Sequence, residues 1–276
     1  MSYQLIKVFG LQRSGNHAII NWILGLDAEH MLFFNNQKVG RPLGGGGVSL
    51  PDEVKANEKR QDGKKIVYPE LVNSFPEWGR SLVVSFENYD LAQYRQEVVD
   101  APIEQLFGPP NSRVVVIVLR NPFCVATSLD RMLPAANTSD YYSRRVRKLC
   151  KDPVRAFGRI RNTIRVKKRG VRHHISGNAA AIMSLWPKYA EASQKKTLGQ
   201  EKVVPIIYDF WLRSAISRHE AADLLDQKNA DKFLDFISDA GGGSSYWGAG
   251  VDVEKIREHS CIERWKRSPS KKSWGK

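Results

Sequence analysis

Two glycines bracket a short polar loop near the N-terminus, in the sequence Gly10-Leu-Gln-Arg-Ser-Gly15. The flanking residues favour a strand before the loop and a helix after it, a junction that offers backbone N–H groups and a helix N-terminus to an anion. A nucleotide-hydrolysing loop of the Walker type would continue with Lys and Ser or Thr, which hold phosphate and Mg²⁺. Here Asn16 and His17 follow, and the cation, Arg13, lies inside the loop. The pattern favours direct anion binding over metal-dependent hydrolysis, with an ordinary strand-to-helix turn as the alternative.

A second set of phosphate ligands is predicted after the apolar residues 114–119. Arg120 directly follows this expected strand, and Ser128 stands eight residues later. Pro122 lies between them and is typical of the first turn of a helix. Ligands of open α/β sheets bind beyond the carboxyl ends of the strands. Arg120 and Ser128 are therefore predicted to converge on one phosphate.

Together the two segments resemble the signatures of the PAPS-dependent sulfotransferase family. In that family a Lys/Arg-Ser-Gly-Thr-Thr type of loop binds the 5′-phosphosulfate of PAPS, and an Arg-Asn-Pro element with a later Ser binds the 3′-phosphate. The likeness is clear for about residues 3–25 and 112–132, and weaker at 82–87 and 206–209. It implies transfer of a sulfonate from PAPS to a hydroxyl or amine, with release of PAP and without a metal.

The resemblance also implies roles for individual residues. Arg13 would stabilise charge on the transferred sulfonate and on the leaving phosphate, while Arg120 and Ser128 would hold the 3′-phosphate. Tyr208 would touch the nucleotide after a further strand, with Asp209 as its neighbouring acid. Other donor contacts are implied for Ser14, Gly15, Asn16 and His17 in the loop, and for Arg264, Lys266 and Arg267 in a basic segment near the C-terminus.

Two departures from the family pattern affect the predicted chemistry. Asn16 and His17 stand where the family has Thr-Thr, which alters the expected 5′-phosphate contacts. The cytosolic branch uses a catalytic His, whereas the corresponding strand end here carries Glu87. Glu87 is the predicted general base, because it ends a strand at the sheet edge that holds both phosphate motifs. His17 is the alternative base, or else a hydrogen-bond donor to the phosphate.

Strands and helices are expected to alternate along most of the chain. Short β-branched runs suit buried strands of a parallel sheet, and apolar residues at three-four spacing suit helices. Strands are predicted at residues 4–9, 31–34, 82–87, 114–119 and 203–208, and helices at 18–24, 122–132, 179–193, 217–227 and 230–237. Residues 35–51, which include four consecutive glycines, are predicted to be a mobile loop.

This alternation indicates a three-layer α/β protein with a central parallel sheet flanked by helices. Within this class, the resemblance to the sulfotransferase family implies a P-loop NTPase-like sulfotransferase fold. The expected organisation is a single domain over residues 1–276, with a basic helical excursion at about residues 140–200.

Most of the net charge of +14 lies in one stretch. Between Arg144 and Arg172 there are thirteen Lys or Arg residues and one acidic residue, Asp152. The positive electrostatic potential of so many cationic side chains suggests a polyanionic partner. The stretch is interpreted as a solvated helix face, a surface for an acidic acceptor, or a nucleic-acid surface. The last is disfavoured because no recognition motif accompanies it.

No apolar run approaches the roughly 20 residues needed to cross a bilayer. The three cysteines are odd in number and lack the spacing of metal ligands. The expectation is a cytoplasmic protein without a membrane span or a metal. The sequence leaves the acceptor open among carbohydrate, lipid, peptide and small alcohol. Two other functions compete: a P-loop kinase, disfavoured by the missing Walker residues, and a non-catalytic nucleotide- or nucleic-acid-binding protein of the same fold.

Overall fold

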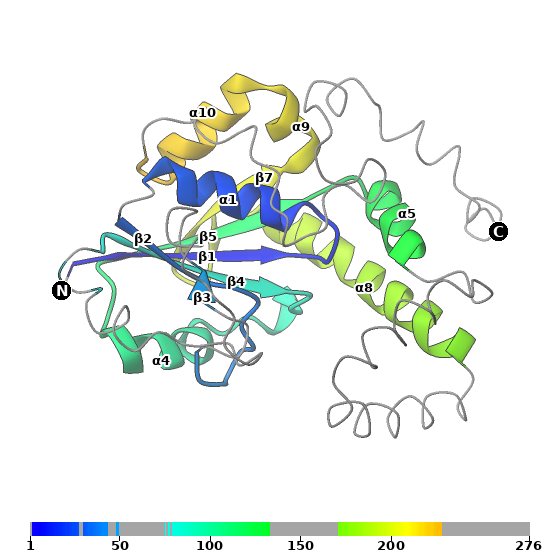
Figure 1. The fold of residues 1–276 in the computed structure, drawn as a ribbon, viewed down its shortest axis with the longest axis horizontal. Helices are drawn as coiled ribbons and strands as arrows, with labels where there is room; N and C mark the ends of the chain where they lie inside the picture. The colour runs from blue at the N-terminus through cyan, green and yellow to red at the C-terminus, as the bar shows by residue number, and fades with distance from the viewer. Residues whose placement is uncertain are drawn as a thin grey trace, which may run out of the picture.

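A seven-stranded sheet forms the centre of the computed structural model, which describes residues 2–27, 30–43, 48–49, 75, 77, 79–132 and 171–227 (Figure 1). The five inner strands are mutually parallel. In sheet order they are β2 (Met31–Phe34), β4 (Ser81–Glu87), β1 (Gln4–Gly10), β5 (Ser112–Leu119) and β7 (Glu201–Ile207). Two short antiparallel strands, β3 (Val48–Ser49) and β6 (Thr197–Leu198), flank them. The predicted α/β class with a central parallel sheet is confirmed, with antiparallel strands added at both edges.

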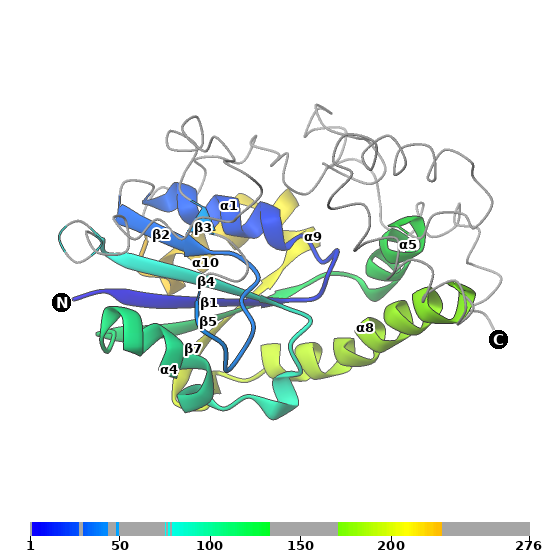
Figure 2. The ribbon, with the colours of Figure 1, turned by 60° about the horizontal axis from the view of Figure 1, so that its bottom comes forward.

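Helices cover both faces of the sheet and complete three layers (Figures 1 and 2). One face carries α1 (Asn16–Leu26), α9 (Tyr208–Arg213) and α10 (Ala215–Leu224); the other carries α4 (Gln96–Phe107), the 3₁₀ turn η2 (Leu91–Gln93) and α8 (Val171–Ser193). Side chains alternate along β1, so Ile6 and Val8 pack with α1 while Leu5 and Phe9 pack with α4. Both faces of the central strand are buried, as its continuous apolar sequence predicts.

Helix α5 (Pro122–Met132) begins just beyond the carboxyl end of β5 and packs against α8. Val125 and Leu129, one helical turn apart, meet Ile182 and Met183 of α8. This packing fixes the helix that follows Arg120 at the same end of the sheet as the glycine loop. Among the described residues, no helix combines the length and the apolar character that crossing a membrane requires.

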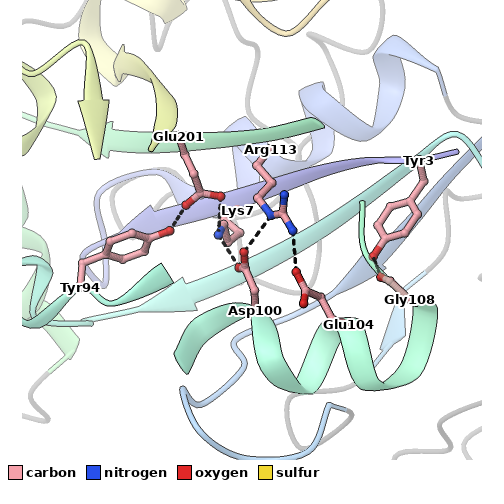
Figure 3. A network of polar contacts seen from close by, with 8 residues as sticks. All are labelled: Tyr3, Lys7, Tyr94, Asp100, Glu104, Gly108, Arg113 and Glu201. Atoms are coloured by element: carbon pink, nitrogen blue, oxygen red, sulfur yellow. Dashed lines mark hydrogen bonds and ion pairs between the residues drawn. The ribbon is translucent and has the colours of Figure 1, made fainter. Parts of the chain in front are cut away.

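A buried lysine links three elements on the α4 side of the sheet (Figure 3). Lys7 of β1 is fully buried, and its ammonium contacts Asp100 of α4 and lies 2.6 Å from Glu201 of β7. Arg113 donates to the other Asp100 oxygen at 3.0 Å, and the Tyr94 hydroxyl donates to Glu201. Burial raises the pKa of the Glu201 carboxyl, and the Lys7 ammonium opposes that shift. Because buried charges are tolerated only when paired, the network fixes α4 against the sheet.

The structure also corrects several predicted elements. The strand expected to end at Tyr208 ends at Ile207, and Tyr208 begins α9. The helix expected to start at residue 179 starts at Val171. Helix α4 was not predicted; Pro102 lies within it, and Val99, Ile103 and Phe107 repeat every four residues on its buried side. The helix predicted at 230–237 and most of the basic excursion lie outside the described residues.

Candidate functional site

The glycine loop, Glu87 and Arg120 all follow strands at one edge of the sheet. In the sheet register, Gly10 at the end of β1 pairs with Glu87 of β4 on one side and with Val118 of β5 on the other. Strands β2 to β4 lie on one side of β1 and strands β5 to β7 on the other, so the direction of winding reverses at β1. A crevice at such a reversal is where ligands bind in open α/β sheets.

Close packing explains both glycines of the loop. Gly15, the N-cap residue directly before α1, has a left-handed φ of 96°, and a Cβ there would lie 2.3 Å from the Tyr208 ring. A Cβ on Gly10 would lie 1.8 Å from the Asn16 side chain. Arg13 also has a left-handed φ, 71°, which is uncommon for a residue with a long side chain. The loop is therefore a tightly specified turn, and its glycine spacing is required by its surroundings.

Ser14 and Asn16 make their side-chain contacts within the loop. The Ser14 hydroxyl lies 2.7 Å from the Leu11 carbonyl oxygen and 2.6 Å from Asn16 Oδ1, while Asn16 Nδ2 donates to the same carbonyl at 3.1 Å. Both side chains are buried. These two side chains stabilise the turn, and their contacts with the donor stay a prediction. The first turn of α1 has no acidic side chain and no side-chain cap, which suits an anion at this helix N-terminus.

Arg120 reaches across from β5 to the glycine loop. Its Nη1 donates to the Arg13 carbonyl oxygen at 3.1 Å, and its guanidinium carbon lies 4.9 Å from the centre of the Tyr208 ring. Trp186 of α8 donates from Nε1 to the Arg120 carbonyl oxygen at 2.9 Å. Arg120 Nε is buried and finds no hydrogen-bond partner within the described part of the chain. A buried donor without a partner carries an uncompensated desolvation cost, so this nitrogen is not explained by the packing of the described residues alone.

The remaining predicted nucleotide contacts come from α5, α9 and the C-terminal segment. Asp209 of α9 accepts a hydrogen bond from the Asn121 backbone N–H at 3.1 Å, which joins α9 to the start of α5. Ser128 is buried on α5. The basic residues assigned to the C-terminal segment lie outside the described residues, and their role stays a prediction: Arg264, Lys266 and Arg267.

A cavity of about 50 Å³ lies between α1, β2 and β4. His17 and Glu87, the two candidate bases, both line it. Its other polar residues are Asn16, Asn35, Asn36 and Ser85. Burial lowers the pKa of the Arg13 guanidinium, and the Glu87 carboxylate opposes that shift. Glu87 therefore lies within electrostatic reach of the loop cation as well as in the cavity.

The chain that leaves β2 is bound to the end of β4 beside this cavity. The Asn36 backbone N–H donates to Ser85 Oγ at 2.8 Å, and the Gln37 N–H donates to the Ser85 carbonyl oxygen at 2.8 Å. Ser85 Oγ lies 3.2 Å from Asn35 Oδ1. The prediction of one mobile loop over residues 35–51 is therefore corrected in part, because these bonds hold its beginning against the sheet and β3 pairs with β2 near its end.

Two residues of the site were missed by sequence reasoning. Asn88, directly after Glu87, has a φ of 58°; its N–H donates to the Gly10 carbonyl oxygen at 3.1 Å, and its Oδ1 accepts from the Gln12 N–H at 2.8 Å. These hydrogen bonds hold the loop against the end of β4. The sequence offers one sign of this role: an Asn directly after a predicted strand, because Asn tolerates a left-handed backbone conformation. Trp186 is the second, and its position in the sequence gives no sign that it contacts Arg120.

Comparisons with known proteins establish no family for this chain. No family model matches it, and no curated protein matches its sequence. One similar solved structure is that of mouse sulfotransferase SULT7A1 complexed with PAP, which is 13% identical over 86% of each chain, with a TM-score of 0.21. A TM-score this low carries no structural argument, so the chemistry of the site has to come from its own residues.

Proposed function

We propose that this protein is a sulfotransferase that moves a sulfonate group from PAPS to a hydroxyl or amine acceptor and releases PAP. The observation that carries the proposal is the contact between Arg120 and the Arg13 carbonyl oxygen, at 3.1 Å, with Arg120 Nε left buried and without a partner among the described residues. The contact joins the two phosphate motifs, which are about a hundred residues apart in the sequence. A nucleotide with phosphates at both ends would engage both motifs together.

The donor would bind to groups on both sides of this contact. Backbone N–H groups of the loop and the N-terminus of α1 suit the phosphosulfate, with Arg13 as the cation. Arg120 and Ser128 would hold the 3′-phosphate, and the Tyr208 ring would border the nucleotide. The close fit of Gly15 against Tyr208 supports this reading, because the absence of a side chain lets the loop backbone and the ring approach each other.

Transfer requires a base as well as a cation. The acceptor oxygen attacks sulfur, the bond between sulfur and the bridging phosphate oxygen breaks, and PAP leaves with that electron pair. The acceptor proton passes to a base, for which Glu87 is proposed and His17 is the alternative. Arg13 would stabilise the charge that develops on the bridging oxygen. Both candidate bases line the cavity beside the loop, which supports their assignment to this step.

Thermal unfolding in the presence of three ligands tests the proposal. PAP without metal is expected to raise the unfolding temperature, because it binds the folded chain alone. Mg·ATP is expected to have a smaller effect, since Lys and Ser or Thr are missing after Gly15. A shift produced only by Mg·ATP would favour a kinase, and a shift produced only by an oligonucleotide would favour a nucleic-acid-binding protein. Either result would contradict the sulfotransferase.

A further inference from the structure

The peptide group between Arg120 and Asn121 is hydrogen-bonded at both of its polar atoms. Its carbonyl oxygen, which belongs to Arg120, accepts from Trp186 Nε1 of α8 at 2.9 Å. Its N–H, which belongs to Asn121, donates to Asp209 Oδ2 of α9 at 3.1 Å. Helices α8 and α9 cover opposite faces of the sheet (Figures 1 and 2), so this peptide group, just beyond β5, is held from both faces.

These two hydrogen bonds fix the direction in which the Arg120 side chain leaves the backbone. A peptide group is planar, so holding its oxygen and its N–H at opposite edges leaves the plane little freedom to rotate. On the other side of Arg120, Leu119 is still paired with Ile207 in the sheet. The backbone is therefore held both before and after the Cα of Arg120, which sets the orientation of its Cα–Cβ bond.

The side chain that leaves this fixed backbone reaches the glycine loop. Arg120 Nη1 donates to the Arg13 carbonyl oxygen at 3.1 Å, and the guanidinium carbon lies 4.9 Å from the centre of the Tyr208 ring. A long side chain on a backbone that is already held loses less entropy when it meets a ligand. The hydrogen bonds from α8 and α9 therefore act on the cation that is proposed to bind the donor.

Trp186 is a fixed donor, and the fold does not depend on its hydrogen bond. One helical turn further on, Tyr189 is fully buried in the core, and Lys188 lies 2.6 Å from Asp90, which caps η2. These contacts hold this part of α8 in place. Trp211 shows that the core tolerates an indole N–H without a protein partner, because its Nε1 is buried and has none within the described ranges. Packing alone therefore does not account for the bond from Trp186 to the strand end.

We infer that Trp186 and Asp209 are positioning residues for donor binding. They hold the peptide group after Arg120 from opposite faces of the sheet, so that the Arg120 side chain is oriented before the donor arrives. The inference rests on the proposed function, because it takes Arg120 as a ligand of PAP. Both residues act through Arg120 and are not catalytic residues, so their loss lowers the affinity for the nucleotide.

Replacement of Trp186 by Phe removes the N–H and keeps an aromatic ring. In a variant shown by urea unfolding to be folded, the Kd for PAP is expected to rise about three- to tenfold, the contribution of one hydrogen bond. Trp211→Phe is the matched control, because it removes an indole N–H that bonds to none of the described residues, and it should leave the Kd unchanged. Equal affinity in Trp186→Phe and the unaltered chain would overturn the inference and leave the proposed function standing, whereas a chain that does not bind PAP loses both.

A double-mutant cycle separates the positioning of Arg120 from a general effect on the fold. In an Arg120→Ala background no guanidinium is left to orient, and the glycine loop still supplies its own contacts to PAP. Adding Trp186→Phe to that background should therefore produce no further rise in the Kd for PAP. A further rise equal to that of the single variant would show that Trp186 acts by another route, and would overturn the inference.

Asp209 tests the other side of the peptide group, and does so even if Trp186→Phe does not fold. Asp209→Ala removes the acceptor of the Asn121 N–H and should raise the Kd for PAP about three- to tenfold. Asp209→Asn keeps a side-chain oxygen that can accept from the same N–H, so it should recover most of the affinity. Equal losses in the two variants, or no loss in a folded Asp209→Ala protein, would overturn the role of this hydrogen bond.

Discussion

The guanidinium of Arg120 lies over the ring of Tyr208, with 4.9 Å from its central carbon to the ring centre. The same ring occupies the space that a Cβ on Gly15 would need. Tyr208 is therefore packed between the two predicted phosphate motifs, touching the glycine of one and the arginine of the other. In this arrangement one Arg120 nitrogen reaches the loop, while Nε is buried without a partner among the described residues.

Arg120→Lys is expected to weaken PAP binding although it keeps the charge. Lysine has no planar fork to stack on Tyr208 and to donate to the Arg13 carbonyl at the same time. The loss of a charge-assisted hydrogen bond corresponds to about 1.5–3 kcal/mol, or roughly a ten- to hundredfold rise in Kd by titration calorimetry. Arg80, exposed just before β4, is the matched control as Arg80→Lys. Equal PAP affinity in the two variants would refute the assignment of Arg120.

Gly15→Ala is expected to destabilise the protein more than Gly40→Ala. Both glycines have a left-handed φ, 96° and 70°, so both variants lose about 1 kcal/mol to backbone strain. Only at Gly15 would the new Cβ meet the Tyr208 ring, whereas nothing lies within 4 Å at Gly40. Urea unfolding measures the difference in the free energy of unfolding, and PAP titration measures the effect on the loop. Equal decreases in the free energy of unfolding at the two positions would mean that the Tyr208 ring moves aside at no cost.

Glu87→Gln is expected to abolish transfer while PAP still binds. The amide keeps the shape of the side chain but cannot take the acceptor proton, so the turnover rate should fall by about 10²–10⁴-fold. The parallel variant His17→Asn tests the alternative base that shares the cavity. Full activity in Glu87→Gln together with an inactive His17→Asn would move the role of base to His17.

Lys7→Met is expected to destabilise the fold strongly. It leaves Glu201 without its buried cation and removes one of the two cations that contact Asp100 (Figure 3). Breaking a buried ion pair in this way typically costs about 3–5 kcal/mol in the free energy of unfolding. Lys202→Met, at an exposed position of β7, should change stability by less than about 0.5 kcal/mol. A small decrease in the free energy of unfolding of Lys7→Met would instead show that the carboxyls of Asp100 and Glu201 become protonated at little cost.

Stability is expected to fall at alkaline pH. Burial raises the pKa of Tyr3 from its ordinary value of 10.0 to about 12, with a further contribution from Glu104. The raised pKa stabilises the folded protein fully at pH values below the pKa that Tyr3 has in the unfolded chain. This stabilisation is lost as the pH rises through the pKa that Tyr3 has in the folded protein. Unfolding by urea at about pH 8 and about pH 11 should show the decrease. Tyr3→Phe should show a smaller decrease over the same interval, and an equal decrease would assign the effect to other groups.

The amino-acid sequence determined the inner strands and the glycine loop with little help from the rest of the fold. Runs such as residues 114–119 are apolar and β-branched, so they have few stable arrangements besides a buried strand. The glycine pair and Arg120 likewise predict anion chemistry from their residue types alone. Helix α4 was not predicted from the sequence. Burial of the side that carries Val99 and Ile103 against the sheet stabilises this helix although Pro102 lies within it.

Tertiary structure decided which of the chemically capable residues share a site. His17, Asn36 and Glu87 come from three separate segments, and only the strand order β2–β4–β1 brings them to one cavity. The clamp made by Asn88 likewise depends on a hydrogen bond to the Gln12 N–H, which is far away in the sequence and close only in the folded chain. The physical reason is that residue type and local spacing govern the conformation of a segment, whereas a binding site is made by segments that meet only when the apolar faces of the sheet and helices are buried together.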